Sequence, residues 1–134
     1  MKQALKSLLL LMVIILIAVP GIMAQQAEET DGEFFHVVFF WLKNPENQAD
    51  REQFEASLKK FIDNSEFILS RHIGTPAATD RPVIDNTWTY SLVLGFKDKE
   101  AQDKYQEEEV HKKFIEEAGD LWEKVLVYDS VRIL

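Results

Sequence analysis

The chain has no cysteine among its 134 residues. Disulfide bonds, a lipid attached through cysteine and a cysteine-bound metal are therefore excluded. The folded part must then be held together by its hydrophobic core alone. With 46% hydrophobic and 28% charged residues, the composition is ordinary for one globular domain, and a chain of this length can bury such a core.

Basic residues are scarce relative to acidic ones, with 15 Lys and Arg against 23 Asp and Glu. Lys2 and Lys6 are the only charged residues before position 25, so the rest of the chain carries 13 basic and 23 acidic side chains. Nucleic acids and anionic membranes both bind clustered Lys and Arg, and the sequence contains no basic stripe. We therefore expect neither to be a partner of the mature chain.

Glycine is sparse as well, and none of the five glycines belongs to a phosphate-binding loop or a dinucleotide fingerprint. A nucleophilic serine elbow is also missing. Glu107 and His111 stand four residues apart and could share a metal ion, but the sequence has no second pair of ligands and no calcium loop. We expect no cofactor and no dedicated metal site.

One long hydrophobic run is present, the twelve residues 8–19, and it follows a short basic start. Pro20 and Gly21 end the run, and Ala24 supplies a small residue for cleavage. This order predicts a secretory signal peptide over residues 1–24, and therefore export to the periplasm or out of the cell. The alternative is a retained N-terminal membrane anchor, because the seventeen residues up to Ala24 reach the lower limit for a span.

Polar residues 25–32 predict a flexible leader, and the pattern after it predicts one domain over residues 33–134. Alternating or continuous apolar residues indicate strands, and apolar residues at helical spacing indicate helices. The predicted strands are 34–42, 66–73, 87–96 and 123–131, the predicted helices are 46–63 and 98–119, and residues 74–85 form a loop. The order β-α-β-β-α-β predicts an α+β, ferredoxin-like fold, with both helices on one face of a four-stranded antiparallel sheet.

The first predicted strand is apolar on both of its faces. Phe35, Val37, Phe39 and Trp41 point one way, and His36, Val38, Phe40 and Leu42 point the other way. Two helices can cover only one face of the sheet, and leaving the other face in water would sacrifice several kcal/mol at about 25 cal/mol per Å². We therefore expect a homodimer in which two sheets pack together and close a barrel.

Several stretches are similar to the stress-responsive dimeric A/B barrel (Dabb) family. They are His-Val-Val-Phe-Phe-Trp-Leu-Lys at 36–43, Tyr-Ser-Leu-Val-Leu-Gly-Phe-Lys-Asp at 90–98, Tyr105 with His111, and Leu-Trp-Glu-Lys-Val-Leu-Val-Tyr-Asp at 121–129. The resemblance covers nearly all of residues 34–131 in order. It implies a dimeric α+β barrel, which agrees with the apolar first strand.

The resemblance also implies candidate catalytic residues. In a polyketide cyclase of the family, a Tyr and a His near the second helix act in an aldol cyclisation, and a His on the first strand lines the pocket. The matching positions are Tyr105, His111 and His36. A His can remove a proton α to a carbonyl, and a Tyr hydroxyl can hold the carbonyl oxygen.

The chain departs from the family pattern in this helix. The family often carries His-Pro-x-His, whereas Glu108-Glu109-Val110-His111 stands here. In a continuous helix Tyr105 and His111 lie about 120° apart around the axis, so they converge only if the helix bends or breaks between them. Without the proline, no break is expected.

Each candidate also has a structural interpretation. His111 could cap a helix or contact the partner protomer, His36 could be satisfied by a buried hydrogen bond, and Tyr105 could serve packing. Three further residues could line a cavity but are typical of a sheet core: His72, Trp88 and Tyr90.

Three functions fit the sequence. The preferred hypothesis is a homodimeric module that binds a small apolar ligand. The second is a cofactor-free cyclase or monooxygenase-type enzyme that acts on an enolisable aromatic or polyketide-like substrate. It ranks lower because a polyketide cyclase works beside a cytoplasmic synthase, whereas export is predicted here. The third is a stress-related structural dimer without a ligand.

Overall fold

The computed structural model describes residues 32–134, so the predicted signal peptide and nearly all of the predicted leader lie outside the described residues. None of the helices in this range is both long and apolar enough to cross a membrane. The elements are β1 (Phe34–Leu42), α1 (Gln48–Asn64), β2 (Ser70–Gly74), β3 (Tyr90–Phe96), α2 (Lys99–Glu107), α3 (Glu109–Ala118), a 3-10 turn η1 (Gly119–Leu121) and β4 (Trp122–Val131).

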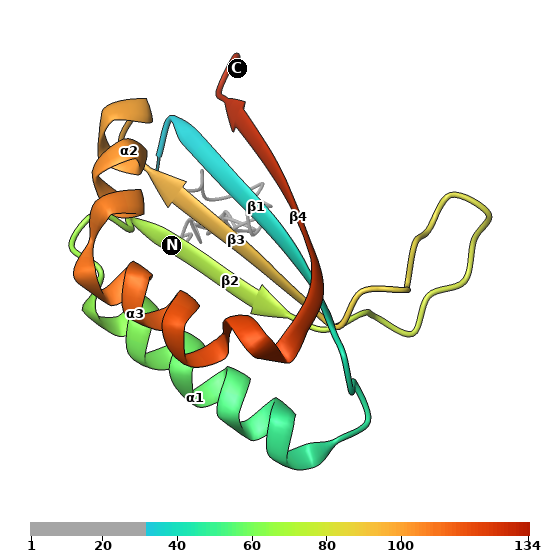
Figure 1. The fold of residues 1–134 in the computed structure, drawn as a ribbon. Coiled ribbons are helices and arrows are strands. Elements are labelled where there is room, and N and C mark those ends of the chain that lie inside the picture. The colour runs from blue at the N-terminus through green and yellow to red at the C-terminus, as the bar shows by residue number, and fades with distance from the viewer. Residues whose placement is uncertain (1–31) are drawn as a thin grey trace, which may run out of the picture.

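The four strands form one sheet in the order β2-β3-β1-β4, and each neighbouring pair is antiparallel. The helices all lie on one side of this sheet, with α1 below α3 in the view of Figure 1. The predicted ferredoxin-like fold is therefore confirmed. β1 is a central strand, and its burial alternates along its whole length, as the sequence pattern predicts.

The core lies between the sheet and the helices. Phe54 on α1 is completely buried, with its ring 5.1 Å from that of Phe40 on β1 and 5.8 Å from that of Phe114 on α3. Full burial of one such side chain contributes about 1.5–3 kcal/mol. Aromatic packing thus joins both helical segments to the central strand.

The opposite face of the sheet is apolar and partly exposed. Side chains on this outer face come from β1, β3 and β4, and they are Phe35, Val37, Phe39, Trp41, Val93, Leu126 and Tyr128. Tyr128 is 58% exposed. Trp88 also lies here, because its ring is 5.3 Å from that of Phe39, and His72 pairs with Val93 on the same face.

Two predicted strands start too early. β2 begins at Ser70 instead of residue 66, because Phe67 and Ile68 pack against the core before the backbone reaches β3. β3 begins at Tyr90 instead of residue 87. Just before β3, the Thr89 hydroxyl accepts a hydrogen bond from the Leu42 N–H at 3.0 Å. It takes the place of the backbone carbonyl that would accept this bond in a regular β-ladder.

The two ends of the described chain meet at one corner of the sheet. Phe34 at the start of β1 pairs with Val131 at the end of β4. Gly32 has a φ of 119°, and a Cβ there would lie 2.7 Å from the carbonyl oxygen of Phe96, so only glycine fits without strain. The carbonyl of Gly32 accepts a hydrogen bond from the Arg132 guanidinium at 2.8 Å.

The predicted helical region over residues 98–119 is present, but it is divided into two helices. Asp98 caps it as expected, since its side chain accepts the Ala101 N–H at 2.8 Å, but the helix stops at Glu107 and a new one starts at Glu109. Glu108 between them has an extended ψ of 137°. This interruption decides the geometry of the site.

Candidate functional site

His36 is the third residue of the central strand β1 and faces the helices. Its side chain is buried, and its Nδ1 lies 2.6 Å from Oδ1 of Asp129, the residue opposite it on β4. A carboxylate can only accept, so Nδ1 carries a proton, and whenever the ring is neutral Nε2 is the nitrogen that holds the lone pair. The ring thus makes a buried hydrogen bond and also lines a cavity, while its role stays a prediction.

Tyr105 projects from the last turn of α2 into the core. Its ring lies 4.8 Å from that of Phe96, 5.5 Å from that of Phe61 and 5.7 Å from that of His36. Burial raises the pKa of the Tyr105 phenol above its ordinary value, so the hydroxyl stays protonated and can donate a hydrogen bond. Among residues 32–134 this hydroxyl has no hydrogen-bond partner and is not sealed from the cavity.

His111 lies in the first turn of α3, half-buried, with its ring 4.8 Å from that of Tyr105. Its Nδ1 is 3.2 Å from the carbonyl oxygen of Gln106, which can only accept, so Nε2 of this ring is also free of a proton. Burial, and to a lesser extent the nearby His36, lower the pKa of His111. The ring is therefore neutral at pH 7 and able to accept a proton.

The interruption at Glu108 brings these three side chains together. A continuous helix would place Tyr105 and His111 on different sides of its axis, whereas their rings are in contact in the structure. Tyr105 and His111 can meet only if the helix breaks between them, and the structure has this break although the segment contains no proline. The three candidates converge, while their catalytic role stays a prediction.

A cavity of about 160 Å³ lies among these residues, between β1 and the α2–α3 segment. Its walls are mostly apolar, and its mouth is formed by Val125, Val127 and Ile115, which are 38%, 43% and 48% exposed. The polar groups at its wall include two imidazoles and one phenol, and Gln106 and Trp122 also line it. We call this space the histidine cavity. It suits a small, mostly apolar molecule that carries an oxygen atom.

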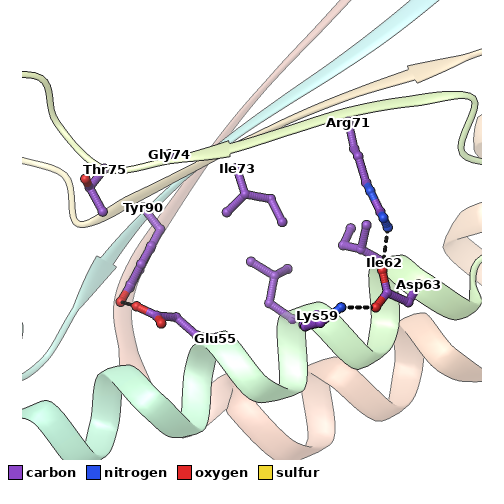
Figure 2. Close-up of a pocket in the computed structure, with 10 residues that line it drawn as sticks. Glu55, Lys59, Ile62, Asp63, Arg71, Ile73, Gly74, Thr75 and Tyr90 are labelled. Atoms are coloured by element: carbon purple, nitrogen blue, oxygen red, sulfur yellow. Dashed lines mark hydrogen bonds and ion pairs between the residues drawn. The ribbon is translucent and has the colours of Figure 1, made fainter.

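A larger hollow of about 510 Å³ lies at the opposite edge of the sheet, between α1 and β2. In Figure 2 Arg71 reaches from β2 toward Asp63 on α1, and the two pair at 2.7 Å. Lys59 also pairs with Asp63, and the Tyr90 hydroxyl donates to Glu55. The charged groups here bind one another, so this hollow is the weaker candidate for chemistry.

Tyr90, His72 and Trp88, which the sequence also offered as cavity residues, lie in different parts of the structure. Tyr90 belongs to the core, as expected, and borders the larger hollow. His72 and Trp88 belong to the outer sheet face, so neither lines the histidine cavity.

The sequence did not identify Asp129 as a residue of the site, since its contact with His36 follows from the β1–β4 register and not from a motif.

The pair considered as possible metal ligands, Glu107 and His111, stands on two different helices, and Glu107 pairs with Lys112 at 3.2 Å. Within the described range no group of three or more His, Asp or Glu residues is placed to hold a metal ion.

The model of the Stress Responsive A/B Barrel Domain family matches residues 34–132. No curated protein sequence matches the chain.

Solved structures share the fold at low sequence identity. A Dabb family protein with a ferredoxin-like fold from Mesorhizobium loti is 22% identical, with a TM-score of 0.63, and the match covers 77% of this chain and 99% of that one. A dimeric ferredoxin-like protein from Thermobifida fusca is 12% identical, with a TM-score of 0.61 and coverage of 80% and 98%. Hydroxynitrile lyase from Passiflora edulis is 19% identical, with a TM-score of 0.62 and coverage of 76% and 94%.

Proposed function

Because the chain belongs to the Stress Responsive A/B Barrel Domain family, we propose that it is an exported homodimer that binds a small, mostly apolar molecule in the histidine cavity. The observation that carries the proposal is the cavity itself, whose apolar walls surround two imidazoles and a phenol hydroxyl that has no partner among the described residues. Apolar cavities of about 150 Å³ bind benzene-sized molecules. A single aromatic ring with one carbonyl group matches this space and its polar groups.

The dimer part of the proposal rests on the outer sheet face. Aromatic and aliphatic side chains from three strands stay partly exposed there, although the other face is buried by helices. Such contiguous apolar surface marks an interaction site, and the similar protein from Thermobifida fusca is dimeric. A second copy packed against this face would cover it.

Binding is tested with acetophenone, an aromatic ring bearing a carbonyl group, added to the isotope-labelled mature protein. We expect saturable shifts in the NMR signals of Tyr105 and His111. Val127→Trp fills the mouth of the cavity and should abolish them. Val131→Trp is the matched control, because Val131 lies on the same strand, is 64% exposed and does not line the cavity. Absence of shifts in the unmodified protein would favour the structural dimer without a ligand.

The convergence of Tyr105 with two imidazoles favours a second function, proton transfer on the bound molecule. Nε2 of His111 or His36 takes a proton from the carbon next to the carbonyl group, and the electron pair moves to the carbonyl oxygen. The Tyr105 hydroxyl donates a hydrogen bond to that oxygen, the imidazolium exchanges its proton with solvent, and it then delivers a solvent-derived proton back to the carbon. The lyase from Passiflora edulis shows that the fold can carry an enzyme.

Exchange of the acetophenone methyl protons with deuterium oxide measures this step directly. We expect exchange above the solvent rate, and a strong decrease in both His111→Ala and Tyr105→Phe. His72→Ala controls for catalysis by any surface imidazole, because His72 lies on the outer face, away from the cavity. Exchange that is equal in all variants would reject the enzymatic function and leave binding intact.

Export rests on the signal-peptide pattern of residues 1–24 alone. The intact mass of the protein from the periplasm or medium should lack these residues. A mass that retains them would favour the membrane anchor instead.

A further inference from the structure

We propose that Glu108 is a positioning residue of the histidine cavity: its carboxylate, bound to the end of α1, keeps α2 and α3 separate and so holds His111 against Tyr105. The inference rests on the proposed function only in taking this cavity as the site. The contacts themselves do not depend on a ligand.

The carboxylate of Glu108 is held at both oxygens by the C-terminal end of α1. The Ser65 hydroxyl donates to Oε2 at 2.6 Å, and the Glu66 backbone N–H donates to Oε1 at 2.7 Å. Ser65 is the residue that caps α1, and it lies 43 positions earlier in the chain. Hydrogen bonds to an ionised group are stronger than neutral ones, so the two contacts fix this side chain on α1.

The anchored side chain accounts for the interrupted helix. In a continuous helix Glu108 would adopt a helical ψ, but here it is extended, at 137°. Its carbonyl begins the new helix by accepting the N–H groups of His111 and Lys112, both at 3.1 Å. Its side chain makes no capping bond to α3. The carboxylate thus acts across the fold, on α1.

The interruption also creates the acceptor that orients His111. In a continuous helix the carbonyl of Gln106 would accept the N–H of Val110. Here that carbonyl meets Nδ1 of His111 at 3.2 Å instead. One break therefore turns the imidazole toward Tyr105 and fixes which ring nitrogen carries the proton.

The test compares Glu108→Ala with Glu109→Ala in the full mature protein without any ligand. Glu109 is the neighbouring acid, and its side chain is 92% exposed. NMR measures the contact between the Tyr105 and His111 rings, the tautomer of His111 and its pKa. Glu108→Ala should abolish the ring contact and raise the His111 pKa toward its ordinary value, because the ring leaves its buried position. Glu109→Ala should change neither.

The opposite sign of the pKa change would overturn the inference. The titratable groups that face His111 are Tyr105, His36, Glu107 and Glu108. If Glu108 acted only as a charge, its removal would lower the His111 pKa further, since the carboxylate favours the protonated ring, and the ring contact would persist.

A rescue variant separates positioning from general damage. Glu109 occupies the first position of α3, where proline is favoured and where it disfavours a helical conformation of the residue before it. Glu108→Ala with Glu109→Pro should therefore restore the ring contact and the low His111 pKa.

Should Glu108→Ala not fold, Glu108→Gln, which keeps the side-chain volume, should shift the contact and the pKa in the same direction. Failure of the proline to restore the contact would refute the positioning role. Loss of acetophenone binding with the contact intact would refute the proposed function alone.

Discussion

Replacing Tyr105 by Phe removes a single oxygen atom from the centre of the site and separates packing from chemistry. The ring is 1% exposed and packs against four aromatic rings, all of which the variant retains. Its hydroxyl has no hydrogen-bond partner among residues 32–134, so no bond is lost. We expect the free energy of unfolding to change by less than about 0.5 kcal/mol. Deuterium exchange into acetophenone should nevertheless fall by about 10²–10³-fold, as for loss of one oxyanion donor.

Tyr90→Phe is the matched control, because Tyr90 is also a core tyrosine but its hydroxyl donates to Glu55 at the other hollow. That variant should lose about 0.5–1.5 kcal/mol and keep full exchange activity. Urea unfolding followed by circular dichroism, at one fixed protein concentration, measures both changes. A loss above about 1.5 kcal/mol in Tyr105→Phe, or undiminished exchange, would show that the hydroxyl has a structural role and would refute the reasoning.

Further predictions concern the outer face, pH and the core. Phe39→Asp puts a charge in the centre of the outer face, and sedimentation should then report a monomer with native circular dichroism; a persistent dimer would place the interface elsewhere. Because burial lowers the pKa of His111, the folded state resists protonation of this ring. Stability should fall as the pH drops below about 6.5, and His111→Gln should flatten that slope. Phe54→Ala should cost about 3–5 kcal/mol in urea unfolding, because the ring is completely buried; a cost below about 1 kcal/mol would contradict the packing.

The fold was readable from the sequence because its signals are local. The alternation in β1 and the helical spacing of Phe54, Leu58 and Phe61 correctly predicted a sheet with one helix-covered face. The predicted starts of β2 and β3 were less accurate. The positions of Phe67 and Thr89 are set by tertiary contacts, which the pattern of a single strand does not contain.

Only part of the candidate site could be predicted from the sequence. Its three residues were named through the family resemblance, but their meeting depends on Glu108, whose partners lie on α1. Helical propensity along residues 107–109 gave no sign of a break, because the cause is not in that segment. Asp129 became visible only through the register of two strands that are far apart in the chain.

The pairing of Phe34 with Val131 has a mechanical consequence. The chain enters β1 and leaves β4 at the same end of an antiparallel pair, so a pull on the two termini loads the interstrand bonds singly, in succession, and the strands peel apart at low force. Asp129 is two residues from that end, so tension between the termini would detach the carboxylate from His36 before the helices are disturbed.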